Sequence, residues 1–201
     1  MFKMRNWITS LVFVAVLGGL GQAFAQESNL LGLYFDPFAE MDCIEASSLP
    51  QYSSVDLYVI LENPTFEELW GFEFSMFIEG PALVTGWYYP HGIPGFNFGE
   101  DGNYVVGLGN PLPMDELNIL MAFHIFYMSP SFEEICFILG PSVPSSLDPL
   151  YPTFAYSEDG LVSASVNNGI EGDCTALISD ASCNVVPTDT QTWDSLKSLY
   201  R

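Results

Sequence analysis

Apolar and polar side chains alternate along residues 70–79, which read WGFEFSMFIE. The apolar members are spaced by two, and they are Trp70, Phe72, Phe74, Met76 and Ile78. Glu73, Ser75 and Glu79 point to the opposite side of an extended chain. A period of two is typical of a β-strand that buries one face and exposes the other. This stretch therefore predicts a half-buried strand.

Similar patterns extend on both sides of this strand. Residues 54–61 alternate in the same way, and Ile119–Met128 is apolar on both faces, as expected of a central strand. Shorter candidates, separated by turn signals, are Leu31–Phe35, Ala82–Tyr88, Tyr104–Leu108, Ile135–Leu139, Thr153–Tyr156 and Leu161–Ala164. Closely spaced strands without amphipathic helices between them predict an all-β, antiparallel sandwich or barrel. The two apolar faces of Ile119–Met128 favour the sandwich, because the lumen-facing side of a membrane barrel is polar.

The first 25 residues have the features of a secretory signal peptide. Lys3 and Arg5 precede an uncharged apolar stretch, which is followed by Ala23-Phe24-Ala25. Signal peptidase recognises such a small-x-small motif, and the apolar stretch is too short to span a bilayer. We expect a cleaved signal peptide, one β-sandwich domain, and a linker with a basic tail, at residues 1–25, 26–184 and 185–201. The expected location is secreted or at the cell surface.

The exported part of the chain is strongly acidic. All 25 acidic residues follow the signal peptide, and only two basic residues do, Lys197 and Arg201, which gives a net charge of 2 − 25 = −23. Residues 26–195 hold no Lys or Arg. Such a surface repels phosphate, which excludes nucleic acids and anionic membranes as partners. Neutral polysaccharides, cations and basic protein partners remain compatible with it, and the acidic exterior also favours solubility.

Four cysteines follow the signal peptide, and they are Cys43, Cys136, Cys174 and Cys183. An even number in an exported chain predicts two disulfides, for which three pairings exist. Closeness in sequence favours Cys174–Cys183, which leaves Cys43–Cys136 to join an early segment to a later strand. A zinc site is the alternative, but there is no CxxC pair and neither histidine lies at ligand spacing.

No catalytic motif is present in the sequence. Nucleophilic catalysis by Ser or Cys needs a neighbouring histidine, and the chain has only His91 and His124. We expect His124 to be a core or sheet-surface residue, because it lies within Ile119–Met128. Pairs of acids such as Glu133-Glu134 could act in glycoside hydrolysis, but they lie beside turn signals where solvated acids are expected. The sequence therefore favours a protein that is not an enzyme.

Calcium is the one cofactor that the acidic loops suggest. Asp36 and Asp42 belong to an acidic cluster after the first strand, and Asp101 belongs to a second acidic loop. Calcium takes six to eight oxygen ligands, often from loop carboxylates. Neither loop has EF-hand spacing, and a hairpin turn also explains the Asp-Gly pair of the second loop.

Trp87, Tyr88, Tyr89 and His91 form the most suggestive ligand-binding group. Sugar rings stack on flat aromatic side chains, so an exposed face here would suit a polysaccharide. In a strand, Trp87 and Tyr89 share one face and Tyr88 lies on the other. Packing of one face against the core is the alternative.

The last ten residues predict a short helix. Thr192 can cap it, and one side carries Trp193, Leu196 and Tyr200, while Lys197 and Arg201 suit the end of a helix dipole. A helix of this length is marginal alone in water, so we expect it to dock on its own domain, on a neighbouring molecule, or on an anchoring or export machine. The segment also resembles a Thr-Trp-x-x-apolar-Lys-x-Leu-Tyr-Arg tail of exported bacterial proteins.

Two segments resemble parts of cohesin-like domains. Residues 56–63 (DLYVILEN) and 70–74 (WGFEF) resemble the opening hairpin, in which a strand ending in Asn leads to an aromatic strand with Gly. Residues 120–125 (LMAFHI) are similar to a later strand. The resemblance implies a jelly-roll β-sandwich of eight to nine strands, in the group of cohesins and carbohydrate-binding modules. Members of this group bind proteins or polysaccharides and are not enzymes.

Together these features predict a non-catalytic extracytoplasmic binding or structural module. Protein–protein adhesion or assembly at the cell surface is the leading hypothesis. A carbohydrate-binding module that uses exposed aromatic residues is the second hypothesis, and a secreted hydrolase is the third.

Overall fold

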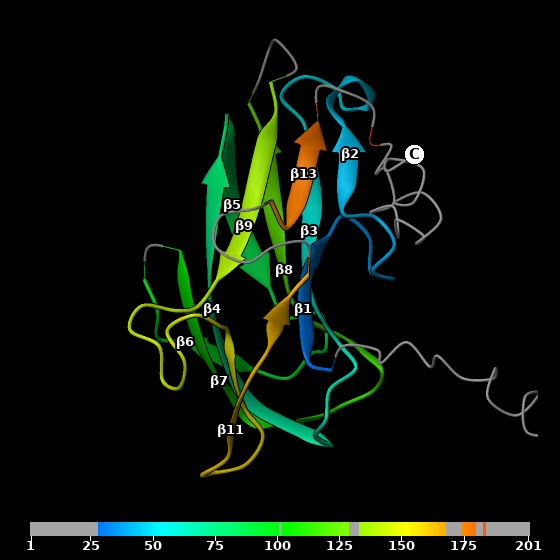
Figure 1. Cartoon of the computed structure of the whole chain (residues 1–201). Coiled ribbons are helices and arrows are strands. Elements are labelled where there is room, and N and C mark those ends of the chain that lie inside the picture. The colour runs from blue at the N-terminus through cyan, green and yellow to red at the C-terminus, as the bar shows by residue number, and fades with distance from the viewer. Residues whose placement is uncertain (1–27, 101, 129–132, 168–173, 180–182, 184–201) are drawn as a thin grey trace, which may run out of the picture.

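Alternating apolar side chains bury one face of each of two β-sheets, which pack together as a β-sandwich (Figure 1). This computed structural model describes residues 28–100, 102–128, 133–167, 174–179 and 183. The predicted signal peptide and the predicted helix at 193–200 lie outside these residues. No helix within the described ranges is long and apolar enough to cross a membrane.

The smaller sheet has five strands in the order β12-β1-β3-β8-β5. Their bounds are Ser165–Val166 (β12), Leu30–Tyr34 (β1), Ser54–Glu62 (β3), Leu117–Tyr127 (β8) and Ala82–Tyr88 (β5). β8 pairs with β3 on one side and β5 on the other, which confirms that the apolar stretch at 119–128 forms a central strand. All pairs in this sheet are antiparallel except β1–β12, which is parallel.

The larger sheet has eight strands. Six follow the order β11-β10-β4-β9-β13-β2, while β7 pairs with β4 and β6 pairs with β7. Their bounds are Leu161–Ser163 (β11), Thr153–Ala155 (β10), Glu68–Glu79 (β4), Ile135–Gly140 (β9), Ala176–Ser179 (β13), Cys43–Glu45 (β2), Asn103–Pro113 (β7) and Gly95–Asn97 (β6). The β13–β2 pair is parallel, and a 3-10 turn (η1, Ala46–Ser48) follows β2.

The predicted all-β sandwich is confirmed, and each predicted strand is present with bounds shifted by a few residues. The thirteen strands of the described part exceed the eight to nine expected. Four of them, β2, β6, β12 and β13, were not predicted. These strands have only two to four residues, which is too few to show a period of two.

Tyr104 joins the two sheets at the centre of the core. Its ring stacks on Phe74 of β4 with centroids 5.0 Å apart, and it meets Phe123 of β8 edge-on at 5.0 Å. Phe74 and Phe123 are fully buried. Such aromatic pairs add about 0.5–1.5 kcal/mol each beyond the burial of their area. The core is therefore continuous from one sheet to the other.

A bulge interrupts the alternation at the beginning of β4. Leu69 is fully buried, whereas Trp70 is 37% exposed. The register of β4 against β7 shifts between Leu69 and Gly71, where Trp70 alone corresponds to residues 108–111 of β7, so the strict alternation does not continue through this point. The predicted placement of Trp70 on the same face as Phe72 is therefore wrong, while the rest of the pattern holds.

Both disulfides differ from the favoured pairing. The structure joins Cys43 to Cys183 and Cys136 to Cys174, so the prediction of Cys174–Cys183 and Cys43–Cys136 is wrong. The reason is that β13 lies between β9, which carries Cys136, and β2, which carries Cys43. Cys174 precedes β13 and Cys183 follows it, so each bonds to a different neighbouring strand. Closeness in sequence does not report this arrangement.

Candidate binding surfaces

The aromatic residues at the end of β5 divide between the two faces of the smaller sheet. Trp87 lies opposite the core residue Phe123, and its ring is 5.4 Å from that of Tyr89. Tyr88 lies on the outer face, so the predicted alternation is confirmed. Trp87 is 42% exposed and Tyr88 is 37% exposed, while Tyr89 packs against the core. The structure therefore does not unite these residues in a single flat surface.

Tyr88 belongs to a polar cluster on the outer face of the smaller sheet. Its ring stacks on His124 at 5.3 Å, and His124 Nδ1 is 2.6 Å from Asp56 Oδ1. Tyr58 hydrogen-bonds to Tyr88, and burial together with these neighbours raises the pKa of Tyr58. The His124 and Asp56 side chains are half-exposed, so their pairing stabilises the fold little. His124 is thus a sheet-surface residue, one of the two predicted placements.

His91 supports the loop that follows β5. Its ring stacks on Tyr89 at 5.8 Å, and its Nδ1 accepts a hydrogen bond from the Ile93 backbone N–H at 3.1 Å. Burial lowers the pKa of His91 and raises the pKa of Tyr89, so both side chains favour their neutral forms. These contacts fix the loop, and they leave Trp87 and Tyr88 as the ligand-accessible members of the predicted group.

The acidic residues proposed for calcium lie in separate loops. Asp36 accepts hydrogen bonds from the backbone N–H groups of Phe38 and Glu40, at 2.7 and 3.2 Å, so it caps the turn after β1. Asp42 immediately precedes β2, and Asp101 lies outside the described residues. Within the described ranges no three His, Cys, Asp or Glu side chains gather in a group able to hold a metal ion. The calcium site stays a prediction.

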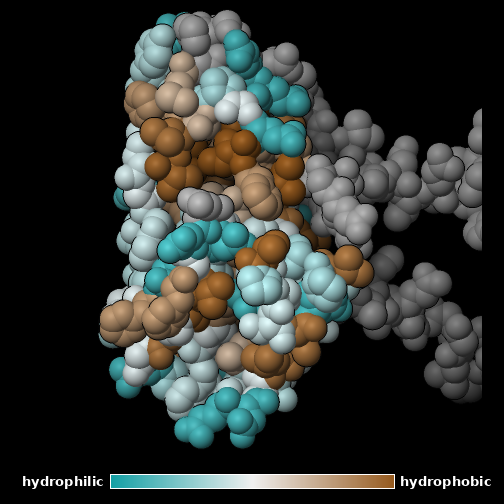
Figure 2. All heavy atoms as spheres, turned by 90° about the vertical axis from the view of Figure 1, so that its left-hand side faces the viewer, coloured by the Kyte–Doolittle hydropathy of each residue, from teal (hydrophilic) through white to brown (hydrophobic). Residues whose placement is uncertain are grey.

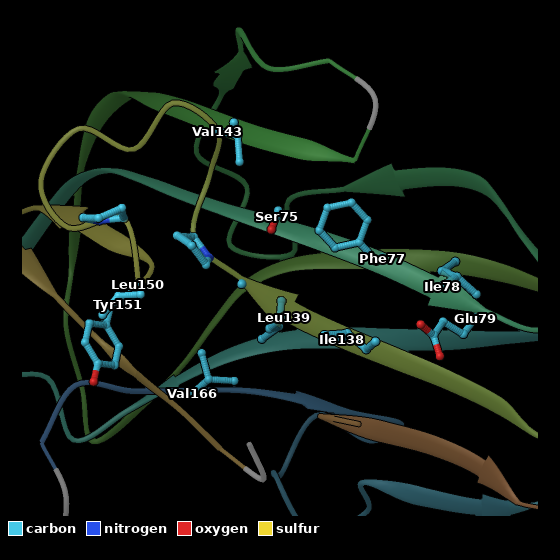
Figure 3. A pocket seen from close by; sticks show the side chains of 13 residues that line it. Ser75, Phe77, Ile78, Glu79, Ile138, Leu139, Val143, Leu150, Tyr151 and Val166 are labelled. Carbon is cyan, nitrogen blue, oxygen red and sulfur yellow. The ribbon is translucent and has the colours of Figure 1, made fainter. Parts of the chain in front are cut away.

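A groove of about 580 Å³ lies on the outer face of the larger sheet. Its floor comes from β4 and β9, where Phe77 lies directly opposite Ile138. Figure 3 shows Leu150 and Tyr151 at one end of the groove and Phe77 and Glu79 toward the other. Most of the lining is apolar, and Glu79 is its only charged residue. The groove therefore suits apolar side chains with a positive charge beside them.

The wall of the groove is the strap, which we define as residues 141–152 between β9 and β10. Glu73, on the outer face of β4, anchors it. Ser146 donates to this carboxylate from its backbone N–H at 2.6 Å and from its hydroxyl at 2.7 Å, and the Ser145 hydroxyl donates at 3.3 Å. Val143 N–H also donates to Asn103 Oδ1 at 2.9 Å. The strap is thus tied to both β4 and β7.

Three large apolar side chains at the groove are exposed. Phe77 is 52% exposed, Leu150 is 54% exposed and Val143 is 73% exposed. Figure 2 shows that hydrophobic residues gather around a hollow on one face of the molecule. Contiguous exposed apolar surface is often found at interaction sites.

This groove was not predicted from the sequence. Phe77 is the residue that could have indicated the groove, because it is apolar and lies among Glu73, Ser75 and Glu79 on the polar side of the alternating strand. No pattern in the sequence predicts the strap, because the path of a loop across a sheet depends on contacts distant in sequence. Glu73 lies on the side of the strand that was predicted to be exposed, but the strap covers it and leaves it 6% exposed.

Comparisons with known proteins concern the fold. A scan against protein-family models finds no match, and a search of curated proteins finds no similar sequence. Among solved structures, the third ScaB cohesin of R. flavefaciens, in complex with a group 1 dockerin, is similar with a TM-score of 0.48 and 11% identity. The match covers 73% of this chain and 94% of that one.

Two further cohesins are similar to the chain. One is the cohesin module of a family 33 glycoside hydrolase from Clostridium perfringens, with a TM-score of 0.47, 8% identity, and coverage of 70% of this chain and 92% of that one. The other is a non-cellulosomal cohesin from Archaeoglobus fulgidus, with a TM-score of 0.46, 11% identity, and coverage of 71% and 86%. These modules belong to the group that the opening hairpin resembles.

Proposed function

We propose that this protein is a non-catalytic extracytoplasmic module that binds another protein through the groove of the larger sheet, in adhesion or assembly at the cell surface. The observation that carries the proposal is the groove itself, with Phe77, Val143 and Leu150 exposed around an apolar floor. Burial of such side chains by a partner supplies the central contacts that dominate protein interfaces. The two disulfides support an oxidising location outside the cytoplasm.

The charge of the domain specifies the chemistry of the partner. Residues 26–195 hold no Lys or Arg, so the described surface offers carboxylates and no cationic group of this kind. A partner segment with apolar residues for the groove and Lys or Arg at its margin, near Glu79, complements this surface. Charge of opposite sign speeds association and excludes acidic competitors. We therefore expect binding that weakens as the salt concentration rises.

Site-specific photo-crosslinking in the producing cells tests the proposal. A photoreactive phenylalanine analogue replaces Phe77 in one variant and Phe38 in a control, because Phe38 is 71% exposed in the loop after β1. We expect a discrete adduct with another protein from position 77 only. The protein identified in this way should then bind the purified chain, and Phe77→Glu should abolish binding while Phe38→Glu preserves it. Equal adducts from both positions, or none from position 77, would refute the proposal.

A carbohydrate-binding role is the second candidate, favoured by the exposure of Trp87 and Tyr88 at the end of β5. Both side chains are partly exposed to solvent, and they lie on opposite faces of one strand. A glycan array probed with the chain and with Trp87→Ala tests this role. Retention on a neutral glycan that the substitution removes would support it, and failure to bind any glycan would exclude it.

A further inference from the structure

The disulfide Cys43–Cys183 places the beginning of the C-terminal segment on the same face of the same sheet as the groove. Glu79, Cys136, Leu177 and Cys43 lie in one row across β4, β9, β13 and β2, because each is directly opposite the next. Residues directly opposite each other on neighbouring strands point to the same face. The neighbours of this row along the strands point into the core, so the row lies on the outer face. Cys183, bonded to Cys43, therefore lies on that face as well.

The distance from Cys183 to the groove is short. Neighbouring strands are about 4.8 Å apart, so β2 and β4 are separated by roughly 14 Å. Phe77 and Ile138 lie two residues along from the row, which is roughly 7 Å. The Cα atoms of Cys43 and Cys183 are 5.7 Å apart. The stretch from Cys183 to Trp193 can extend to about 33 Å, so it reaches the groove with length to spare.

The chemistry of residues 192–201 matches the groove. Trp193, Leu196 and Tyr200 fall on one side of a helix, and the groove offers an apolar floor for such a stripe. Lys197 and Arg201 are the only Lys and Arg residues after Arg5, and residues 26–195 hold many acids but no Lys or Arg. The two surfaces are therefore complementary in both apolar character and charge.

We propose that residues 192–201 dock in the groove of their own chain as a helix, with Trp193 and Leu196 against Phe77 and Ile138. Attachment at Cys183 gives the segment a local concentration of roughly millimolar order, so even weak intrinsic affinity fills the groove. Docking also supplies the partner surface that a helix of this length needs. This inference does not depend on the proposed function. If both hold, a protein partner must displace the segment from the groove.

Fluorine NMR of the chain from Gln26 onward, labelled with 5-fluorotryptophan, tests the docking. Only Trp70, Trp87 and Trp193 then contribute signals, and a peptide of residues 190–201 gives the position of the free Trp193 signal. We expect the Trp193 signal of the chain to differ from the peptide signal and to be independent of protein concentration. Phe77→Glu and Leu196→Asp should each lower the docked-to-free ratio by roughly tenfold or more. Phe38→Glu should leave the ratio unchanged.

The outcomes separate this inference from its alternatives. Unchanged signals from Trp70 and Trp87 show that Phe77→Glu keeps the fold, and Leu196→Asp lies outside the domain core. A Trp193 signal at the peptide position in the unsubstituted chain would overturn the proposal. A docked signal that survives Phe77→Glu would place the segment elsewhere, and one that disappears on dilution would assign it to a second copy. In the crosslinking experiment, an adduct of position 77 with residues 192–201 alone would support docking and count against the proposed function.

Discussion

Glu73 is a carboxylate buried in a domain that offers it no Lys or Arg. Its charge is stabilised instead by three donors from the strap, at Ser145 and Ser146. Hydrogen bonds to a charged group contribute about 1.5–3 kcal/mol each at most, and an amide replaces only part of that. We predict that Glu73→Gln lowers the free energy of unfolding by about 1–3 kcal/mol, measured by urea denaturation.

Glu79 provides the matched control for this prediction, because it lies on the same face of β4 and is exposed. Glu79→Gln should change the free energy of unfolding by less than about 0.5 kcal/mol. Hydrogen exchange should also show faster exchange at Ser146 in Glu73→Gln alone. Equal destabilisation by both substitutions would mean that Glu73 does not anchor the strap.

The environment of the Tyr34 hydroxyl predicts how the stability of the fold depends on pH. Its hydroxyl donates to Glu62 at 2.6 Å and accepts from Asn167, and burial together with Glu62 raises the pKa of Tyr34 well above its usual value of 10.0. The Tyr34 hydroxyl keeps its proton in the folded state at a pH where the unfolded chain has lost it. The contribution of this protonated hydroxyl to the free energy of unfolding is therefore complete below pH 10 and is lost as the pH rises above it. We predict a fall in the urea midpoint above pH 10 that is smaller in Tyr34→Phe. An identical alkaline fall in both proteins would contradict it.

At the scale of elements, Gly71 lies at the register shift between β4 and β7, where the two backbones approach closely. A Cβ atom at this position would lie 2.6 Å from the backbone oxygen of Val106 on β7, which cannot move aside without disturbing the pairing. We predict that Gly71→Ala destabilises the fold by about 1–3 kcal/mol in thermal or urea denaturation. Gly86 at the bulge in β5 is the control, because a Cβ there would meet only His124 at 3.8 Å. A larger loss from Gly86→Ala would contradict this explanation.

Strands that repeat with a period of two could be predicted from the sequence, but their interruptions could not. β3 and β5 were predicted almost residue for residue, since their alternation depends on local pattern alone. Trp70 was misplaced because the register of β4 against β7 shifts between Leu69 and Gly71, and this pairing joins residues distant in sequence. The strap was missed for the same reason, since Glu73 anchors residues more than seventy positions away.

The candidate site could be predicted only in part. The alternation of Trp87, Tyr88 and Tyr89 was correct, because it follows from strand geometry. Their role with His91 in ligand binding stays a prediction, and in the structure His91 packs on Tyr89. Phe77 is the one residue of the groove that departs from the alternating pattern of the sequence. The other lining residues lie on separate segments, which only the register of β4 and β9 brings together.

At the scale of the whole molecule, the two proposals make the acidic exterior and the apolar groove a single recognition surface. A partner and the chain's own residues 192–201 offer similar chemistry to it, so the two compete. The apparent affinity for a partner then equals the intrinsic affinity reduced by the fraction of molecules whose groove is free. Under this scheme, a substitution within the segment that releases it from the groove, such as Leu196→Asp, should raise the apparent affinity for a partner although the substituted residue does not contact the partner.

The Cys43–Cys183 disulfide connects the two ends of the described domain, with 140 residues between its cysteines. A bridge that closes so long a loop restricts the unfolded chain strongly, by roughly 5 kcal/mol in the chain-entropy relation. We predict that Cys43→Ser with Cys183→Ser lowers the free energy of unfolding by about 2–5 kcal/mol in non-reducing urea denaturation.

The same variant should also lower the docked fraction of Trp193, because the segment loses its attachment on the outer face of the larger sheet. Cys136→Ser with Cys174→Ser is the control, since its 38-residue bridge stabilises the fold but leaves that attachment in place. Full docking after loss of Cys43–Cys183 would show that the disulfide does not direct the segment to the groove.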